Sequence, residues 1–143
     1  MNRPIYETPE SLRSEATLAE SIKEKLLPGW ELVKLPIRYR LDYACLDDQG
    51  VIRKFYELKC RTCNMHDYFT YMLSAEKFMT AKQYIRDLGV PCSLIVRWKD
   101  IDGWANLKYC DYSLKIGGRK DRGDSQDIEP VIHIPIDEFS IIE

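Results

Sequence analysis

The most constraining feature of the sequence is a mostly apolar run at Cys92–Trp98, which reads CSLIVRW. A strand of this composition suits the centre of a sheet, where other elements cover both of its faces. Two amphipathic segments can supply that cover, because apolar residues recur at helical spacing in Ser11–Leu27 and between Ser74 and Gly89. The sequence therefore predicts an α/β fold in which helices flank a mixed sheet.

The pattern also predicts which helical residues are buried. In the first helix we expect an apolar stripe of Leu12, Ala16, Ala19, Ile22 and Leu26. In the second helix the expected stripe is Ala75, Phe78, Met79, Ile85 and Leu88.

Strand patterns fill the rest of the chain. Three strands are expected between the helices, at Trp30–Ile37, Arg38–Leu46 and Val51–Lys59, with a hairpin turn at Asp47–Gly50 and a loop at Cys60–Leu73. After the central strand, a turn at Asp102-Gly103 leads into a strand at Trp104–Tyr112, then a polar loop at Gly117–Gln126 and a last strand at Val131–Ile142. The order is α-β-β-β-α-β with extra C-terminal strands.

Length and composition narrow the function classes. The 143 residues suit one domain, and the odd count of five cysteines argues against a disulfide framework. No apolar run is long enough to span a membrane, and the N-terminus lacks the core of a signal peptide, so we expect a soluble, cytoplasmic protein without a membrane partner. Two histidines and no Gly-rich phosphate loop give little support to a Ser–His–Asp hydrolase or a nucleotide-binding protein.

Charge is unevenly distributed along the chain. The net charge of −2, from 21 basic and 23 acidic residues, taken alone argues against a nucleic-acid partner. However, residues 123–143 contain six acidic residues and no basic one, whereas residues 32–61 and 115–122 are locally basic. A normally solvated surface is the preferred explanation of these segments, so the charge pattern alone does not select a partner.

The segment from Asp42 to Lys59 carries the chemistry. Side chains alternate along a strand, so Glu57 and Lys59 point to one face, and the hairpin brings Asp42 near the level of Glu57. Two neighbouring carboxylates repel each other and favour a divalent cation between them, and oxygen ligands suit Mg²⁺ or Mn²⁺. A metal with a nearby lysine is the arrangement that phosphodiester hydrolysis requires.

A solvated strand face is the simpler interpretation of the same residues, since Glu-x-Lys is a common tripeptide. The catalytic interpretation is favoured because Asp42 and Glu57 lie in otherwise apolar runs, where an unpaired charge is costly.

These residues and the order of elements resemble the PD-(D/E)xK nuclease superfamily, which has the restriction endonuclease-like fold. Asp42 matches the Asp that ends the second strand, and Glu57-Leu58-Lys59 matches the tripeptide of the third; Leu41 replaces the usual proline. The resemblance covers about residues 12–99, and we expect residues 1–143 to form a single nuclease-like domain. It implies that a glutamate of the first helix joins the metal site, with Glu20 preferred and Glu15 as the alternative.

The resemblance further implies a Mg²⁺-dependent enzyme that cleaves DNA, as an endonuclease rather than an exonuclease. Relatives carry a phosphate-contacting residue on the second helix, for which Lys77 is the first choice over Lys82 and Gln83. The small size is similar to that of phage-encoded nucleases and resolvases, which makes a homodimer one alternative. An inactive DNA-binding or regulatory module with the nuclease fold is the second functional hypothesis.

Other segments offer further contacts with DNA or metal. Arg61 and the basic loop residues Arg119, Lys120 and Arg122 are candidates for binding the phosphate backbone. Tyr68, Phe69 and Tyr71 either stack on unpaired bases or pack over the core, and packing is the preferred interpretation. Cys60, Cys63 and His66 have a spacing that Zn²⁺ or an iron–sulfur cluster could use, but unligated thiols are favoured because a fourth ligand would have to come from far away.

Overall fold

The computed structural model describes residues 9–36, 38–117 and 129–143, and within these ranges its largest element is a mixed sheet of six strands. In spatial order the strands are β1 (Glu31–Lys34), β2 (Tyr43–Leu46), β3 (Ile52–Cys60), β5 (Cys92–Arg97), β6 (Asp102–Asn106) and β9 (Ser140–Ile142). Neighbouring strands are antiparallel except β3 and β5, which are parallel. A smaller antiparallel sheet contains β4 (Thr70–Ser74), β8 (Glu129–Pro135) and β7 (Ser113–Gly117), in that order.

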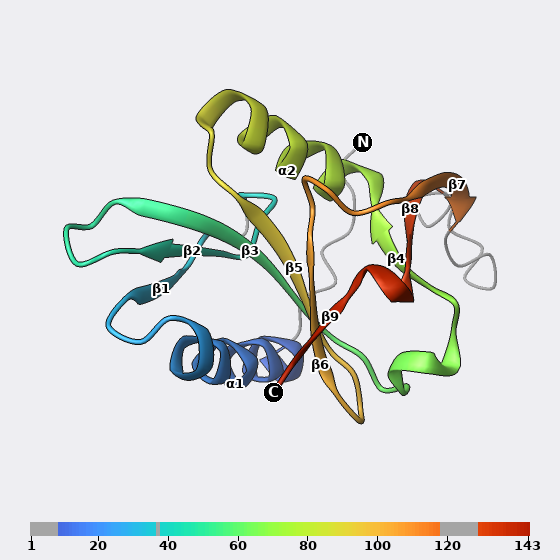
Figure 1. Cartoon of the computed structure of the whole chain (residues 1–143), viewed down its shortest axis with the longest axis horizontal. Helices are drawn as coiled ribbons and strands as arrows, with labels where there is room; N and C mark the ends of the chain where they lie inside the picture. The colour runs from blue at the N-terminus through green and yellow to red at the C-terminus, as the bar shows by residue number, and fades with distance from the viewer. Residues whose placement is uncertain (1–8, 37, 118–128) are drawn as a thin grey trace.

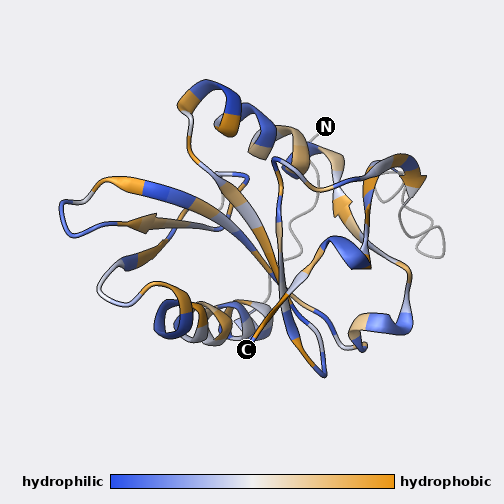
Figure 2. Cartoon of the chain, in the orientation of Figure 1, coloured by the Kyte–Doolittle hydropathy of each residue, from blue (hydrophilic) through white to orange (hydrophobic). Residues whose placement is uncertain are grey.

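The two long helices lie on opposite faces of the main sheet, with α1 (Pro9–Leu26) on one side and α2 (Ala75–Leu88) on the other (Figure 1). Both helices show alternating hydrophilic and hydrophobic bands in Figure 2, as expected when one face of a helix is buried. Two short 3-10 helices, η1 (Met65–Asp67) and η4 (Ile136–Glu138), lie in the connections of the described residues.

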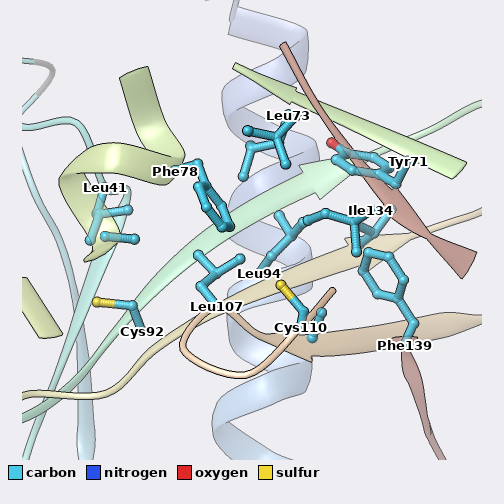
Figure 3. Packing of buried hydrophobic residues seen from close by; sticks show 14 of the residues in the cluster. Leu41, Tyr71, Leu73, Phe78, Cys92, Leu94, Leu107, Cys110, Ile134 and Phe139 are labelled. Carbon is cyan, nitrogen blue, oxygen red and sulfur yellow. The ribbon is translucent and has the colours of Figure 1, made fainter. Parts of the chain in front are cut away.

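The main sheet separates two hydrophobic cores. On the α1 side, Leu18 and Ile22 pack against Tyr56, Leu58 and other sheet residues. On the α2 side, the core also includes the second sheet: Figure 3 shows Phe78 of α2, Leu94 of β5 and Ile134 of β8 directed into one cluster. The smaller sheet is therefore joined to the main one by a shared core. This core supports the interpretation of the whole chain as one domain, which stays a prediction.

Strand β3 alternates between these two cores, and this alternation positions the site. Tyr56 and Leu58 belong to the core on the α1 side, whereas Phe55 belongs to the core on the α2 side. By the same alternation, Glu57 and Lys59 face α2. Five residues of β5, Cys92 to Val96, are buried, so the apolar run is a central strand covered on both faces, as predicted.

Turn residues set the register of the elements around the site. In the β2–β3 hairpin, Oδ1 of Asp47 accepts hydrogen bonds from the backbone N–H groups of Gln49 and Val51, and Gly50 takes a φ of 78° that glycine adopts without strain. Tyr43 thereby pairs with Tyr56, which places Asp42 opposite Glu57.

The predicted α/β fold with a mixed sheet between helices is confirmed, but details of the two helical stripes are wrong. Leu12 and Leu26 are 39% and 44% exposed, and Leu18 takes their place in the core. On α2, Met79 and Leu88 are 67% and 61% exposed, whereas Ala81 is fully buried. Neither α1 nor α2, the long helices of the described residues, has the length and apolar character that crossing a membrane requires.

Several strand boundaries also differ from the prediction. The second strand begins only at Tyr43, because residues 38–42 form turns and bends, and the predicted loop Cys60–Leu73 contains β4. Asp102 and Gly103 lie inside β6, and the turn precedes them, where Trp98 N–H donates to the carbonyl of Ile101. The predicted last strand divides into β8 and β9, which lie in different sheets.

The central strand provides a test of this architecture. Leu94→Ala should lower the free energy of unfolding by about 2–5 kcal/mol, because Leu94 is fully buried where α2 and both sheets meet and its removal leaves a cavity. Leu114→Ala, at a residue of β7 that is 64% exposed, is the matched control and should change it by less than about 0.5 kcal/mol. Denaturant unfolding of both variants measures the difference; equal losses would contradict the topology.

Candidate active site

Asp42, which directly precedes β2, lies next to Glu57 of the neighbouring strand β3. The backbone of Asp42 is held from both sides: its N–H donates to the Tyr56 carbonyl at 3.1 Å and its carbonyl accepts from Leu35 N–H at 2.8 Å. Its Oδ2 accepts a hydrogen bond of 3.0 Å from the backbone N–H of Leu58. Asp42 is 7% exposed and Glu57 only 1%, so both carboxylates are buried in a rigid backbone frame.

Two ammonium groups compensate the Glu57 carboxylate. Lys77 Nζ lies 2.9 Å from Oε2 and 3.2 Å from Oε1 of Glu57, and Lys59 Nζ lies 3.4 Å from Oε2. Lys77 also donates to the carbonyl of Arg40 at 2.9 Å. Lys77 is predicted to contact DNA. In the structure its ammonium pairs with Glu57, and a role in DNA binding stays a prediction.

Burial dominates the electrostatics of Glu57. It raises the pKa of this carboxyl to about 7, against the opposing effect of the ammonium of Lys59. The Asp42 carboxylate adds to the rise by repulsion, and Lys77 opposes it. For Lys59, burial alone would lower the pKa, but the negative charges of Glu57 and Asp42 outweigh burial and raise it, so Lys59 carries its proton at neutral pH.

A third lysine links the first helix to the site. Lys34, at the end of β1, has its Nζ 3.7 Å from Oδ1 of Asp42 and 3.6 Å from Oε2 of Glu15. The Glu15 side chain is only 12% exposed. The preferred Glu20 instead is exposed and lines a shallow hollow with Lys23, Glu24 and Pro28. Of the two glutamates considered for α1, the structure brings Glu15 to the carboxylates and leaves Glu20 away from them.

Arg61 and Tyr71 border the site on the side of the second sheet. Arg61, which directly follows β3, donates from Nη2 to the hydroxyl of Tyr71 at 2.8 Å, and its guanidinium lies 4.7 Å from the centre of that ring. Tyr71 itself is buried, which raises the pKa of its hydroxyl to about 12. The preferred prediction that three aromatic residues pack over the core is therefore confirmed only for Tyr71, because Tyr68 and Phe69 are exposed.

The other candidate sites have different outcomes. Cys60 packs against the core on the α1 side and Cys63 against the core on the α2 side, while His66 is exposed. Within residues 9–36, 38–117 and 129–143, no three His, Cys, Asp or Glu side chains gather closely enough to hold a metal ion. The predicted DNA contacts at Arg119, Lys120 and Arg122 lie outside the described residues.

Sequence reasoning overlooked Lys34 and the role of Tyr71. The only signal for Lys34 was register, because Lys34 pairs with Tyr43 and so lies beside Asp42. Tyr71 could be placed only with β4, a strand that was expected to be a loop.

The comparisons with known proteins bear on the fold and on the family. The structure resembles Hjc of Archaeoglobus fulgidus, a Holliday junction resolvase from an archaeal hyperthermophile, with a TM-score of 0.55 and 12% sequence identity over 73% of this chain and 78% of that one. At this identity the likeness shows a shared restriction endonuclease-like fold. No curated protein matches the chain in sequence.

The family follows from the sequence itself. Residues 1–142 match the family described as "Phage putative PDDEXK endonuclease", and the chain belongs to this family. The resemblance inferred from Asp42, Glu57 and Lys59 is thereby confirmed at the level of the family, and the protein is a nuclease of the PDDEXK class. The roles of the individual residues stay predictions.

The buried Glu57 predicts a pH-dependent stability. The folded, metal-free protein holds a proton on Glu57 up to about pH 7, whereas the unfolded chain releases it near pH 4.5. The contribution of Glu57 to the free energy of unfolding is therefore fully present below pH 4.5 and is lost as the pH rises through 7. The free energy of unfolding should fall by about 3 kcal/mol between pH 5 and 8 through this group.

Chemical unfolding in EDTA across that pH range measures the effect. Glu57→Gln should flatten the profile, because an amide does not ionise, whereas the exposed control Glu20→Gln should keep the wild-type slope. A Glu57→Gln profile as steep as that of the wild type would contradict the assignment.

Proposed function

We propose that the protein is a metal-dependent endonuclease that hydrolyses DNA phosphodiester bonds at Asp42, Glu57 and Lys59. The observation that carries the proposal is the buried pair of carboxylates with a charged lysine beside it, held by the backbone of β2 and β3. The family supports the nuclease chemistry. The description of the family as a phage family supports our proposal that the protein acts in the cytoplasm of a host cell. The resemblance to a resolvase supports our proposal of a homodimer.

The residues at the site fit Mg²⁺, or Mn²⁺, held by Asp42 and Glu57. Both carboxylates are buried and adjacent, and burial has already made the negative charge on Glu57 costly. Mg²⁺ needs only one or two carboxylates, because it keeps several waters and takes substrate phosphate oxygens as well. A bound divalent cation supplies the charge that polarises the phosphodiester and lowers the pKa of water. Glu15 would support Asp42 through Lys34.

Lys59 would act on the attacking water and on the phosphate. Its raised pKa keeps the ammonium charged, so that it donates hydrogen bonds at neutral pH. An ammonium fixed in a water-poor site stabilises negative charge that develops on the phosphate more strongly than one in bulk water. The Lys59 side chain is 30% exposed, so the solvent reaches it although Glu57 lies 3.4 Å from its Nζ.

Lys77 and Arg61 would contact the phosphate backbone. Lys77 shares its ammonium between Glu57 and the Arg40 carbonyl, so neutralising Glu57 with a divalent cation would release it for a phosphate. Arg61 is exposed beside the site and retains donors beyond its bond to Tyr71. Arg119, Lys120 and Arg122 remain proposed backbone contacts because of their charge.

The ion pairs of Glu57 favour a second candidate, a DNA-binding or regulatory module that does not cleave. Two ammonium groups lie within 3.4 Å of this carboxylate, as in a structural ion-pair network. Such a module would retain DNA with every divalent ion and cleave none of it.

Cleavage of a closed circular plasmid tests the first proposal, because a circle without ends is a substrate for an endonuclease only. With Mg²⁺ or Mn²⁺ the wild type should nick or linearise it, and Asp42→Asn and Lys59→Met should each lose at least about 100-fold in rate. Asp48→Asn, at an exposed carboxylate of the hairpin, is the control and should keep full activity. Wild-type rates in Asp42→Asn or Lys59→Met would refute the site.

A matched pair of α1 variants tests the contribution of the first helix. Glu15→Gln should raise the Mg²⁺ concentration needed for half-maximal cleavage about 10-fold, because Lys34 would then pair with Asp42 alone and compete with the metal. Glu20→Gln should leave the Mg²⁺ requirement unchanged, since Glu20 is exposed and away from the carboxylates. The reverse order of effects would restore Glu20 as the metal-site glutamate.

A further inference from the structure

Two aromatic rings are exposed side by side in sequence on the segment that joins η1 to β4. Phe69 is 96% exposed and Tyr68 is 67% exposed, whereas Tyr71, two residues later, is buried. Burying an aromatic ring is strongly favourable, so two adjacent exposed rings offer apolar area to a ligand that can cover them.

The backbone beneath the rings is firmly held. The carbonyl of Phe69 accepts a hydrogen bond of 3.0 Å from Ile136 N–H. Just before the rings, η1 is anchored by the buried Met65, whose N–H donates to Asp100 Oδ1 at 2.9 Å, and is capped by Asp67, whose Oδ2 accepts from Asn64 N–H at 2.9 Å. Rings on such a support lose little conformational freedom when they bind a ligand.

The rings lie on the segment that directly follows the carboxylate site in the chain. The segment leaves β3 just after Lys59 and returns as β4 to the start of α2, which carries Lys77 (Figure 1). Tyr71 is near enough to Lys59 and Glu57 for their charges to act on its hydroxyl. Phe69 precedes Tyr71 by two residues, which is about 7 Å of extended chain.

The charge beside the rings suits a nucleic acid. Arg61 is exposed, and its guanidinium is held next to this segment by its contacts with Tyr71. The nearby carboxylates of Asp67 and Asp100 accept backbone N–H groups of the same segment. A strand whose phosphate meets Arg61 can therefore present its next bases to the rings.

We propose that Tyr68 and Phe69 form a stacking platform for unpaired bases, so that the protein prefers DNA with a single-stranded segment next to the cleaved bond. Base faces are open in single strands, overhangs and branches but covered in a blunt duplex, so the platform favours only the former. The identity of DNA as the ligand rests on the proposed function, whereas base stacking is tested by binding alone.

Fluorescence anisotropy in EDTA measures this preference without cleavage, using a short labelled single strand, a blunt duplex of the same sequence, and that duplex with an overhang. The wild type should bind the single strand and the overhang more tightly than the blunt duplex. Phe69→Ala should weaken binding to the first two by roughly 5- to 100-fold and leave the blunt duplex unchanged. Tyr109→Ala, an aromatic residue that is 74% exposed elsewhere, is the matched control and should change nothing.

Two further variants separate stacking from general apolar contact. Phe69→Tyr keeps the ring and should keep the affinity, whereas Phe69→Leu keeps apolar area without the ring and should lose most of it. Wild-type affinity in Phe69→Ala or Phe69→Leu, or equal affinity for all three DNAs, would overturn the platform.

Two outcomes separate this inference from the nuclease proposal. Single-strand preference that depends on Phe69, without cleavage in Mg²⁺ or Mn²⁺, would refute the catalytic proposal and support the platform. Cleavage with unchanged binding in Phe69→Ala would refute the platform only. If Phe69→Ala instead converts a dimer into a monomer by light scattering without affecting single-strand preference, the rings bind a second copy and the inference is wrong.

Discussion

The burial of one carboxylate, that of Glu57, organises the structure around it. Glu57 lies on a strand covered by helices on both faces, where an isolated negative charge would be prohibitively unstable. Lys59 on the same strand and Lys77 on the first turn of α2 place positive charge beside this carboxylate. The charge balance of the site therefore depends on the packing of α2 against the sheet. A buried, imperfectly compensated acid is typical of functional sites rather than of stability alone.

The surroundings of the site come from parts of the chain that are distant in sequence. Lys34 of β1 connects Asp42 to Glu15 of α1, and Arg61 connects the end of β3 to Tyr71 of the second sheet. The second sheet is thus more than an addition to the nuclease core, since Tyr71 of its strand β4 holds Arg61 at the border of the site.

The predictable part of the site was the part fixed by local rules. Strand alternation and hairpin register suffice to place Asp42, Glu57 and Lys59 together, because both are set by the nearest neighbours in sequence. The choice between Glu15 and Glu20 was not predictable. Residues five apart lie about 140° apart around a helix, and periodicity does not fix which side of a polar face turns toward the sheet edge. Likewise, β4 was overlooked because its partner β8 follows only after more than fifty residues.

This long-range pairing bears on how the molecule folds. Tyr71 pairs with Ile134, and β9 follows β8 and pairs with β6 at the edge of the main sheet, so both sheets depend on contacts between segments far apart in sequence. Pairing between segments this distant in sequence slows folding, because a long loop has to close before the contacts form. The second sheet, with the border that it gives the site, is therefore expected to form after the local β2–β3 hairpin that carries the carboxylates.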